Sequence, residues 1–137
     1  FDIELLGARV GEAIDWTRDS DMARLPIGLF GASTGAAAAL VAAADEPRVA
    51  AVVSRGGRPD LAGDALRRVQ APTLLIVGGL DYGVIELNRS AQQLLRCRNR
   101  LDIVPGATHL FEEPGTLESV VERATSWFVE NLCAPQA

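Results

Sequence analysis

The chain has 137 residues, of which 48% are hydrophobic and 23% are charged. This size and balance are typical of one soluble globular domain, so a single domain is expected over residues 1–137. The 13 basic residues against 18 acidic ones give a net charge of −5, which argues against nucleic acid or a membrane surface as a partner. Every basic residue is arginine, so catalysis through a lysine Schiff base is excluded.

Histidine and cysteine are too scarce to build a zinc site. The single histidine is His109, and the two cysteines, Cys97 and Cys133, stand far apart in the sequence. No structural zinc is expected, and the cysteines are interpreted as reduced, partly buried thiols. The roughly 18 continuous apolar residues that a membrane-spanning helix requires occur nowhere, so a cytoplasmic protein is expected.

The first third of the chain predicts a helix, a strand, a tight turn and a second helix. Between residues 3 and 16, apolar side chains recur at three- and four-residue spacing, which is typical of an amphipathic helix. The apolar run 25–30 predicts a strand, and the alanine-rich run 36–44 predicts a helix. Trp16, at the end of the first helix, is expected to lie in the core.

Strands and helices are predicted to alternate along the rest of the chain. In order, they are a strand at 49–53, a helix at 61–69, a strand at 73–77, a helix at 84–95, a strand at 101–104 and a helix at 117–132. Apolar strands that alternate with helices predict an α/β fold, a doubly wound and mostly parallel sheet with helices on both faces. Residues 135–137 are expected to form a frayed tail.

The opening of the chain indicates that part of the fold precedes it. The first residue is Phe1 rather than Met, and a helix comes before the first strand. We therefore expect residues 1–137 to be the C-terminal part of a longer domain whose N-terminal strands are missing. The strand at 25–30 then has an exposed edge, and we expect a preceding segment or homo-oligomer formation to cover it.

The first tight turn carries the most specific motif in the sequence. Gly31-Ala32-Ser33-Thr34-Gly35 is a G-x-S-x-G sequence between a predicted strand and a predicted helix, which is the context of a nucleophile elbow. A serine on such a sharp turn has a strained backbone, so its neighbours Gly31, Gly35 and Ala36 are expected to be small for steric reasons. The Thr34 N–H lies at the predicted helix start and can donate to an oxyanion.

An acidic residue and a histidine follow two later strands. Asp81 comes after the strand at 73–77, and His109 comes after the strand at 101–104. Because the ends of parallel strands meet at one edge of a sheet, these loops are expected to lie close to Ser33. The order Ser33, Asp81, His109 is that of an α/β-hydrolase triad. Asp60, in the loop after the second strand, is an alternative acid and also resembles a helix N-cap.

On these residues the whole chain resembles the C-terminal part of a dienelactone hydrolase-like α/β-hydrolase. The matching motifs are GASTG, TLLIVGGLD and VPGATHLFEEPG. The resemblance implies that Ser33 is the nucleophile, that His109 acts as base and then acid, and that Asp81 orients the imidazole. Dienelactone hydrolases proper use cysteine at this position, so the serine is more similar to the esterases of the wider superfamily. Members of this kind also occur fused to phosphoribosyltransferases.

The expected function is therefore hydrolysis of carboxylic esters or lactones through an acyl-enzyme, with no cofactor and no metal. Thr34 N–H and a donor outside the chain are expected to hold the oxyanion. Arg55 and Arg58 flank a glycine pair near the expected site, and Arg55 is a candidate for attracting an anionic substrate, although solvated loop arginines are a common alternative. Tyr82, next to Asp81, is a candidate for lining the substrate pocket.

Two other interpretations remain open at this stage. The segment 27–58 also reads as strand, glycine-rich turn, helix, strand and arginine, which is compatible with an NADP site. Its glycines do not fit G-x-G-x-x-G, and the chain has no lysine for a Tyr-x-x-x-Lys dehydrogenase pair. The second alternative is a non-catalytic or incomplete hydrolase-like module, because the second oxyanion donor of this fold comes from a loop after an earlier strand.

Overall fold

A four-stranded parallel sheet forms the centre of the molecule. The structure is a computed structural model that describes residues 2–133, and the predicted tail at 135–137 lies outside these residues. The strands are β1 (Ile27–Ala32), β2 (Val49–Arg55), β3 (Thr73–Gly78) and β4 (Asn99–Val104). They lie side by side in the order β1-β2-β3-β4, and every pair is parallel.

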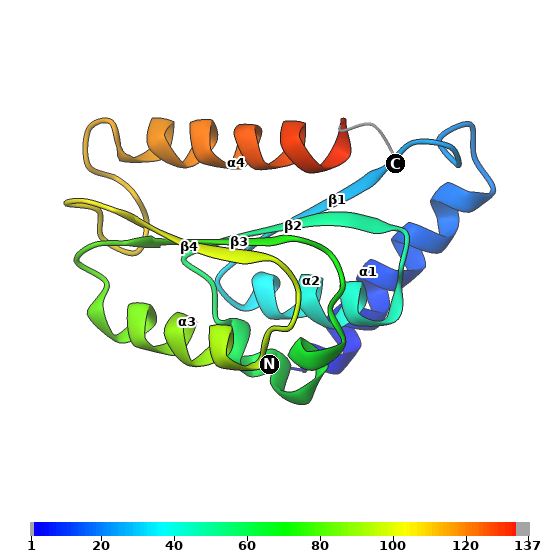
Figure 1. Cartoon of the computed structure of the whole chain (residues 1–137), viewed down its shortest axis with the longest axis horizontal. Helices are drawn as coiled ribbons and strands as arrows, with labels where there is room; N and C mark the ends of the chain where they lie inside the picture. The colour runs from blue at the N-terminus through cyan, green and yellow to red at the C-terminus, as the bar shows by residue number, and fades with distance from the viewer. Residues whose placement is uncertain (1, 134–137) are drawn as a thin grey trace.

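Helices cover both faces of this sheet (Figure 1). One face packs against α2 (Thr34–Asp45) and α3 (Tyr82–Leu94), and the 3₁₀ segment η1 (Pro59–Arg68) packs against these two helices. The opposite face packs against α4 (Thr116–Leu132). Connections between successive parallel strands place their helices on one side because such crossovers are right-handed. The predicted α/β architecture, a parallel sheet with helices on both faces, is confirmed.

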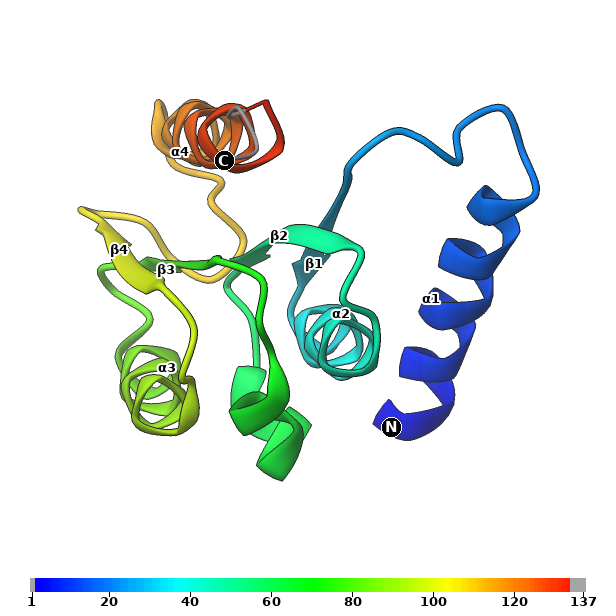
Figure 2. The ribbon, with the colours of Figure 1, turned by 45° about the vertical axis from the view of Figure 1, so that its right-hand side comes forward.

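Helix α1 (Ile3–Arg18) packs on α2 beside the sheet (Figure 2). It begins at Asp2, whose carboxylate accepts a hydrogen bond from the Leu5 N–H at 2.9 Å. The two helices approach closely at Gly7, where a methyl group would lie 2.7 Å from Val41 Cγ1. The prediction for Trp16 is wrong, since its side chain is 65% exposed and Ile14 is the residue of that turn that is buried.

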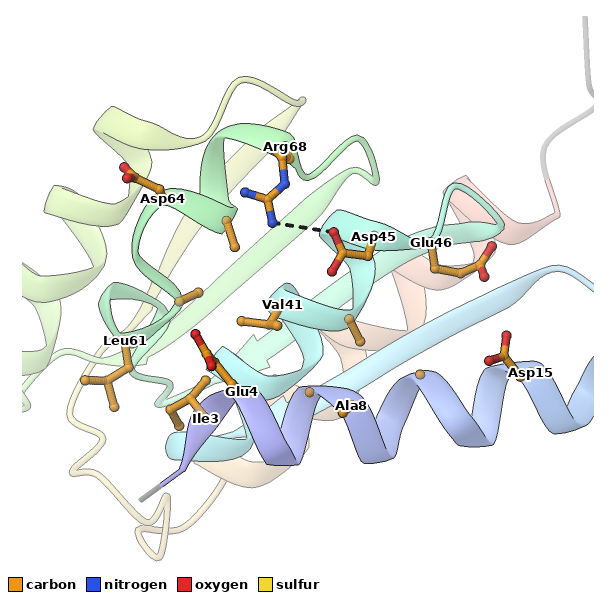
Figure 3. A pocket seen from close by; sticks show the side chains of 15 residues that line it. Ile3, Glu4, Ala8, Asp15, Val41, Asp45, Glu46, Leu61, Asp64 and Arg68 are labelled. Carbon is orange, nitrogen blue, oxygen red and sulfur yellow. Dashed lines mark hydrogen bonds and ion pairs between the residues drawn. The ribbon is translucent and has the colours of Figure 1, made fainter.

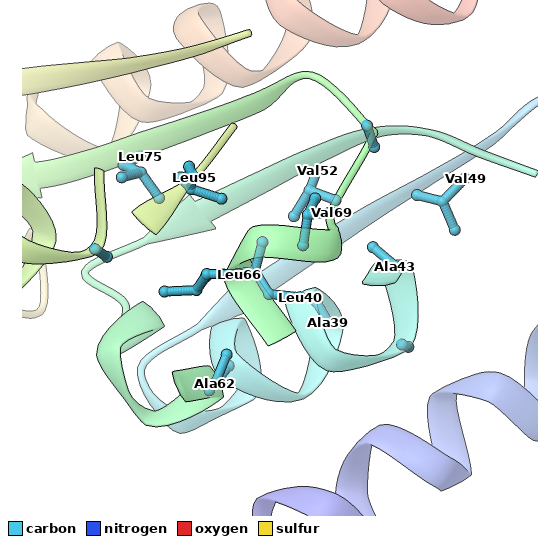
Figure 4. Close-up of a cluster of buried hydrophobic side chains, with 14 of the residues drawn as sticks. Ala39, Leu40, Ala43, Val49, Val52, Ala62, Leu66, Val69, Leu75 and Leu95 are labelled. Carbon is cyan, nitrogen blue, oxygen red and sulfur yellow. The ribbon is translucent and has the colours of Figure 1, made fainter. Parts of the chain in front are cut away.

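Two hydrophobic clusters, one on each face of the sheet, form the core. The first lies between the sheet and α2, η1 and α3, with Leu40, Val52, Leu66 and Leu75 at its centre (Figure 4). The second lies under α4 and includes the buried Trp127. Neighbouring strand residues point to opposite faces, so each strand contributes to both clusters. The nearly continuous apolar runs in the sequence reflect this burial on both faces.

Some element boundaries differ from the predicted ones for local reasons. Strand β1 begins at Ile27 rather than at residue 25, because Pro26 has no N–H for the ladder and pairing starts with Ile27 opposite Val49. The segment predicted as a helix at 61–69 is a 3₁₀ segment that is interrupted at Gly63, where φ is 57° and ψ is −134°. These differences leave the order of elements unchanged.

Strand β1 is an edge strand within residues 2–133, since it pairs with β2 alone. Beside it, a shallow groove of about 580 Å³ runs between the sheet and α4. Its lining includes the exposed apolar side chains of Phe30, Leu110, Leu117 and Val121. Within the same residues, no helix has the length and apolar character needed to cross a bilayer.

Candidate active site

Ser33 occupies a strained turn between β1 and α2. Its φ of 51° and ψ of −125° lie where non-glycine residues are rare, and the half-buried residue stands at the N-cap position of α2. Serine at this position usually caps the helix with its hydroxyl, but Ser33 makes no such bond. The Oγ atom is therefore not engaged in holding the helix start.

Lack of space for a side chain explains the glycine at one of the two glycine positions of this turn. A methyl group on Gly31 would lie 2.6 Å from Ala36 Cα and 2.6 Å from Gly35 O, so strand and helix meet there without room for a side chain. At Gly35 a methyl group would meet nothing within 4 Å. The steric prediction is thus confirmed for Gly31 and wrong for Gly35 within the described residues, because Gly35 faces outward from the turn.

Asp81 and His109 meet at the same edge of the sheet. Asp81 follows β3, His109 follows β4, and Asp81 Oδ2 lies 2.7 Å from His109 Nδ1. Asp81 stands at the N-cap position of α3, yet its carboxylate makes no capping bond and contacts the imidazole instead. The Asp81 side chain is 17% exposed and that of His109 is 42% exposed, so the imidazole is the more open partner of the pair.

The serine lies at this edge too, but it is not hydrogen-bonded to the imidazole. Ser33, Asp81 and His109 follow β1, β3 and β4, and in a parallel sheet all these loops lie at the carboxyl end. Between Ser33 Oγ and His109, both within the described residues, the structure has no hydrogen bond. Bonds of this kind are often long or poorly aligned until substrate is bound.

Asp60, the alternative acid, is held elsewhere. Its two carboxylate oxygens accept hydrogen bonds from Arg58 Nε at 3.0 Å and Arg58 Nη2 at 2.9 Å. Asp60 lies inside the first turn of η1 and is not its N-cap, so that interpretation is wrong. The hydrogen bond with Asp60 raises the pKa of the Arg58 guanidinium, so Arg58 stays protonated and paired with this carboxylate. In the described residues the carboxylate that is hydrogen-bonded to His109 is that of Asp81 and not that of Asp60.

Arg55 and Tyr82 have different surroundings. The Arg55 guanidinium lies 5.5 Å from the centre of the Phe111 ring, and the described residues give it no acidic partner. It borders the groove beside α4 together with Phe30 and Leu110. Tyr82, the first residue of α3, is 70% exposed and stays a candidate by its position beside Asp81 alone.

The histidine loop is closed by a contact that the sequence did not reveal. Thr108 donates from its N–H to Glu113 Oε1 at 3.0 Å and from its hydroxyl to Glu113 Oε2 at 2.6 Å. Between them Phe111 is buried with a φ of 55°, in the left-handed region. A threonine and a glutamate five residues apart in a loop carry no recognised signature, so no pattern could have identified this closure.

Glu113 is expected to make the stability of the protein depend on pH. The hydrogen bonds from Thr108 lower the pKa of Glu113 below its usual value of about 4.3. A lowered folded-state pKa means that the stabilisation is complete above the unfolded pKa and is lost as the pH falls through the folded one. The melting temperature of Glu113→Gln should therefore lie below that of the natural protein near pH 7, and the difference should shrink below about pH 4.

Thermal unfolding monitored by circular dichroism across this pH range measures the difference. Glu112→Gln is the matched control, because Glu112 is exposed and the carboxylate that accepts from Thr108 is that of Glu113. A difference between Glu113→Gln and the natural protein that stays constant with pH would contradict the account.

Other features of the described residues do not form a second centre. A groove of about 650 Å³ lies between α1, α2 and η1, and its carboxylates include Asp45, which is paired with Arg68 at 3.4 Å (Figure 3). None of the predicted site residues lines it. No three His, Cys, Asp or Glu side chains within residues 2–133 gather as metal ligands.

Comparison with known proteins places the chain in a family. The sequence model of the dienelactone hydrolase family matches residues 6–132. The chain belongs to the dienelactone hydrolase family. The resemblance found in the sequence is thereby confirmed.

Proteins of known structure share this fold. A dienelactone hydrolase from Anabaena variabilis is 56% identical with a TM-score of 0.94, over 96% of this chain and 62% of that chain. The esterase domain of a Rhodothermus marinus protein has a TM-score of 0.78 at 22% identity, over 92% of this chain and 69% of that chain, which shows likeness of fold.

Two longer relatives are named after a transferase and not after a hydrolase. Two Mycobacterium tuberculosis proteins that carry the provisional name phosphoribosyl transferase are 62% identical to this chain over 138 residues. The match covers 98% of this chain and 31% of each relative. The chain therefore spans about a third of the length of these relatives.

Proposed function

We propose that the chain carries the nucleophile, base and acid of a serine hydrolase that cleaves carboxylic esters or lactones. One observation carries the proposal: Asp81 contacts His109 at the sheet edge where Ser33 stands on a strained turn with an uncapped hydroxyl. Each of Ser33 and Asp81 occupies a helix N-cap position without capping the helix. Side chains that forgo this stabilisation, worth about 1 kcal/mol, are candidates for another task.

The proposed reaction is acyl transfer in two halves. Ser33 Oγ attacks the carbonyl carbon while His109 Nε2 takes the hydroxyl proton, and the resulting oxyanion accepts a hydrogen bond from Thr34 N–H. Asp81 keeps the proton on Nδ1 and stabilises the imidazolium. The C–O bond to the alcohol then breaks as Nε2 returns the proton to the leaving oxygen. Water attacks the acyl-Ser33 ester in the same way and releases the acid.

We also propose that the substrate carries a negative charge near the scissile bond. Arg55 has no acidic partner in the described part of the chain, and it lines the same groove as the apolar side chains of Phe30 and Leu110. A guanidinium in such surroundings suits a carboxylate on an otherwise apolar acid. Tyr82 is proposed to contact the opposite end of the substrate from its place beside Asp81.

Residues outside the 137 are proposed to complete the site. In this fold the second oxyanion donor lies in a loop after an earlier strand. The open edge of β1 within the described residues and the 62% share of the Anabaena chain favour a longer domain, of which this is the C-terminal part. We assign the transferase name of the mycobacterial relatives to the two thirds of their length outside this match. An uncovered β1 edge is expected to cause dimerisation.

The acyl-enzyme is tested by competition between water and methanol. Esters that share one acyl group but differ in their alcohol are hydrolysed by the full-length protein in dilute methanol. If all pass through the same acyl-Ser33, the ratio of methyl ester to free acid is the same for every alcohol. A ratio that changes with the leaving alcohol would contradict an acyl-enzyme.

A further inference from the structure

The end of β2 and the loop after it, residues 55–58, are hydrogen-bonded to the Ser33 backbone and border the histidine. Ser33 N–H donates to Arg55 O at 3.3 Å, and Arg58 N–H donates to Ser33 O at 3.0 Å. The loop is tied to the sheet by Gly56 N–H, which donates to Ile76 O at 2.7 Å. Gly56 has a φ of 53°, and a methyl group on it would lie 3.4 Å from His109 Cε1 and Nδ1. The position of this loop therefore affects the Ser33 backbone and one side of the imidazole.

Asn88 anchors the loop from α3. Its side chain is fully buried, and its Nδ2 donates to Gly57 O at 3.1 Å and to Val84 O, one turn earlier in the helix, at 2.8 Å. The helix that carries Asn88 begins directly after Asp81. One buried amide thus connects the helix beside the acid to the segment that is hydrogen-bonded to Ser33 and borders His109.

The packing around Gly57 makes this anchor sensitive to displacement. A methyl group on Gly57 would lie 2.0 Å from Ser54 Oγ and 2.5 Å from Ala36 Cβ, so the loop fits closely against β2 and α2. Asn88 Oδ1 and Ser54 Oγ are buried without a hydrogen-bond partner in the described residues. An unpaired buried oxygen is unfavourable, and a leucine of similar volume would avoid it. The amide therefore contributes through its two hydrogen bonds from Nδ2. One stays within α3, to Val84 O, and the other joins the helix to Gly57 O.

We propose that Asn88 is a positioning residue for the reaction proposed above. Its hydrogen bond to Gly57 O holds the loop 55–58 where Arg55 O and Arg58 N–H fix the Ser33 backbone and Gly56 borders His109. It does not touch the substrate. Displacements of about 1 Å at a reacting group cost on the order of a hundred-fold in rate, so loss of the bond should lower kcat by about 10- to 100-fold. Because substrate contacts are unchanged, KM should change little.

The test uses two variants in the full-length protein. Asn88→Leu keeps the side-chain volume and removes both hydrogen bonds. Asn88→Ser keeps a bond to Val84 O, since a helical serine hydroxyl reaches the carbonyl one turn back, but is too short to reach Gly57 O. Both should lose about 10- to 100-fold in kcat and in labelling of Ser33 by a fluorophosphonate, with unchanged KM and a folded circular dichroism spectrum. If Asn88→Leu does not fold, Asn88→Ser decides.

Two controls separate positioning from general packing. Ser54→Ala removes a buried hydroxyl beside Gly57. This hydroxyl has no hydrogen-bond partner in the described residues, so the variant should leave kcat unchanged. Asn131→Ala removes a similar bond to the carbonyl one turn back, Trp127 O, on α4 far along the chain from the site, together with the bond that Asn131 Oδ1 accepts from Arg98. Full activity of folded Asn88→Ser, or an equal loss in Ser54→Ala, would overturn the proposal. Failure of the natural protein to label at Ser33 would instead contradict the serine hydrolase itself.

Discussion

Replacing Ser33 by alanine is expected to lower ester hydrolysis by at least about a thousand-fold, because no other group of the site can form the acyl-enzyme. The fold should be unaffected, since the Ser33 hydroxyl makes no capping bond to α2. Initial rates with a chromogenic ester, measured at equal concentrations of folded protein, give the ratio. Residual activity from oxyanion stabilisation alone is expected, so the loss is large but not complete.

The control for this variant is Ser126→Ala, an exposed serine on α4. It should retain the rate of the natural protein. A Ser33→Ala protein that hydrolyses esters within a few-fold of the natural rate would show that the reaction does not use this serine.

Replacing Asp81 by asparagine is expected to produce the second large loss, on the order of 10⁴-fold in kcat. Asparagine can still contact His109 Nδ1, but its amide favours the wrong imidazole tautomer and cannot stabilise the imidazolium. Since Asp81 Oδ2 and His109 Nδ1 are 2.7 Å apart, the effect should act through the histidine and leave KM nearly unchanged. Steady-state kinetics over a range of pH values measure both parameters.

Asp60→Asn is the matched control for Asp81→Asn. It removes the charge that pairs with Arg58, at 3.0 and 2.9 Å, and leaves the bond between Asp81 and His109 in place. Its kcat should stay within a few-fold of the natural value. If Asp60→Asn loses as much activity as Asp81→Asn, the acid has been assigned to the wrong loop.

The predictable part of this protein follows from local chemistry. The alternation of apolar runs and helical segments indicated the parallel sheet, and the steric need at Gly31 followed from the sharp turn. The positions of Asp81 and His109 after successive strands predicted that they share an edge, because parallel strands end together. Local sequence was enough here, since each inference depended on one turn or one strand end.

What could not be predicted depends on contacts between distant segments. The bond from Asn88 to Gly57 joins residues that are 31 positions apart, and the buried asparagine resembles any polar residue in a helix until the packing of α3 on the loop is known. Trp16 was expected in the core but is exposed, because α1 packs on α2 through Gly7 and Trp16 lies on the opposite side of the helix. Amphipathic spacing predicts that a face is buried, but not how much of it.

Activation of Ser33 by His109 and Asp81 is measured with a fluorophosphonate probe, followed by intact-mass measurement and peptide mapping of the full-length protein. We expect one adduct on Ser33 that is absent from Ser33→Ala and forms far more slowly in His109→Ala. A folded protein that gains no adduct, or gains one at another residue at the same rate in all three proteins, would contradict this activation.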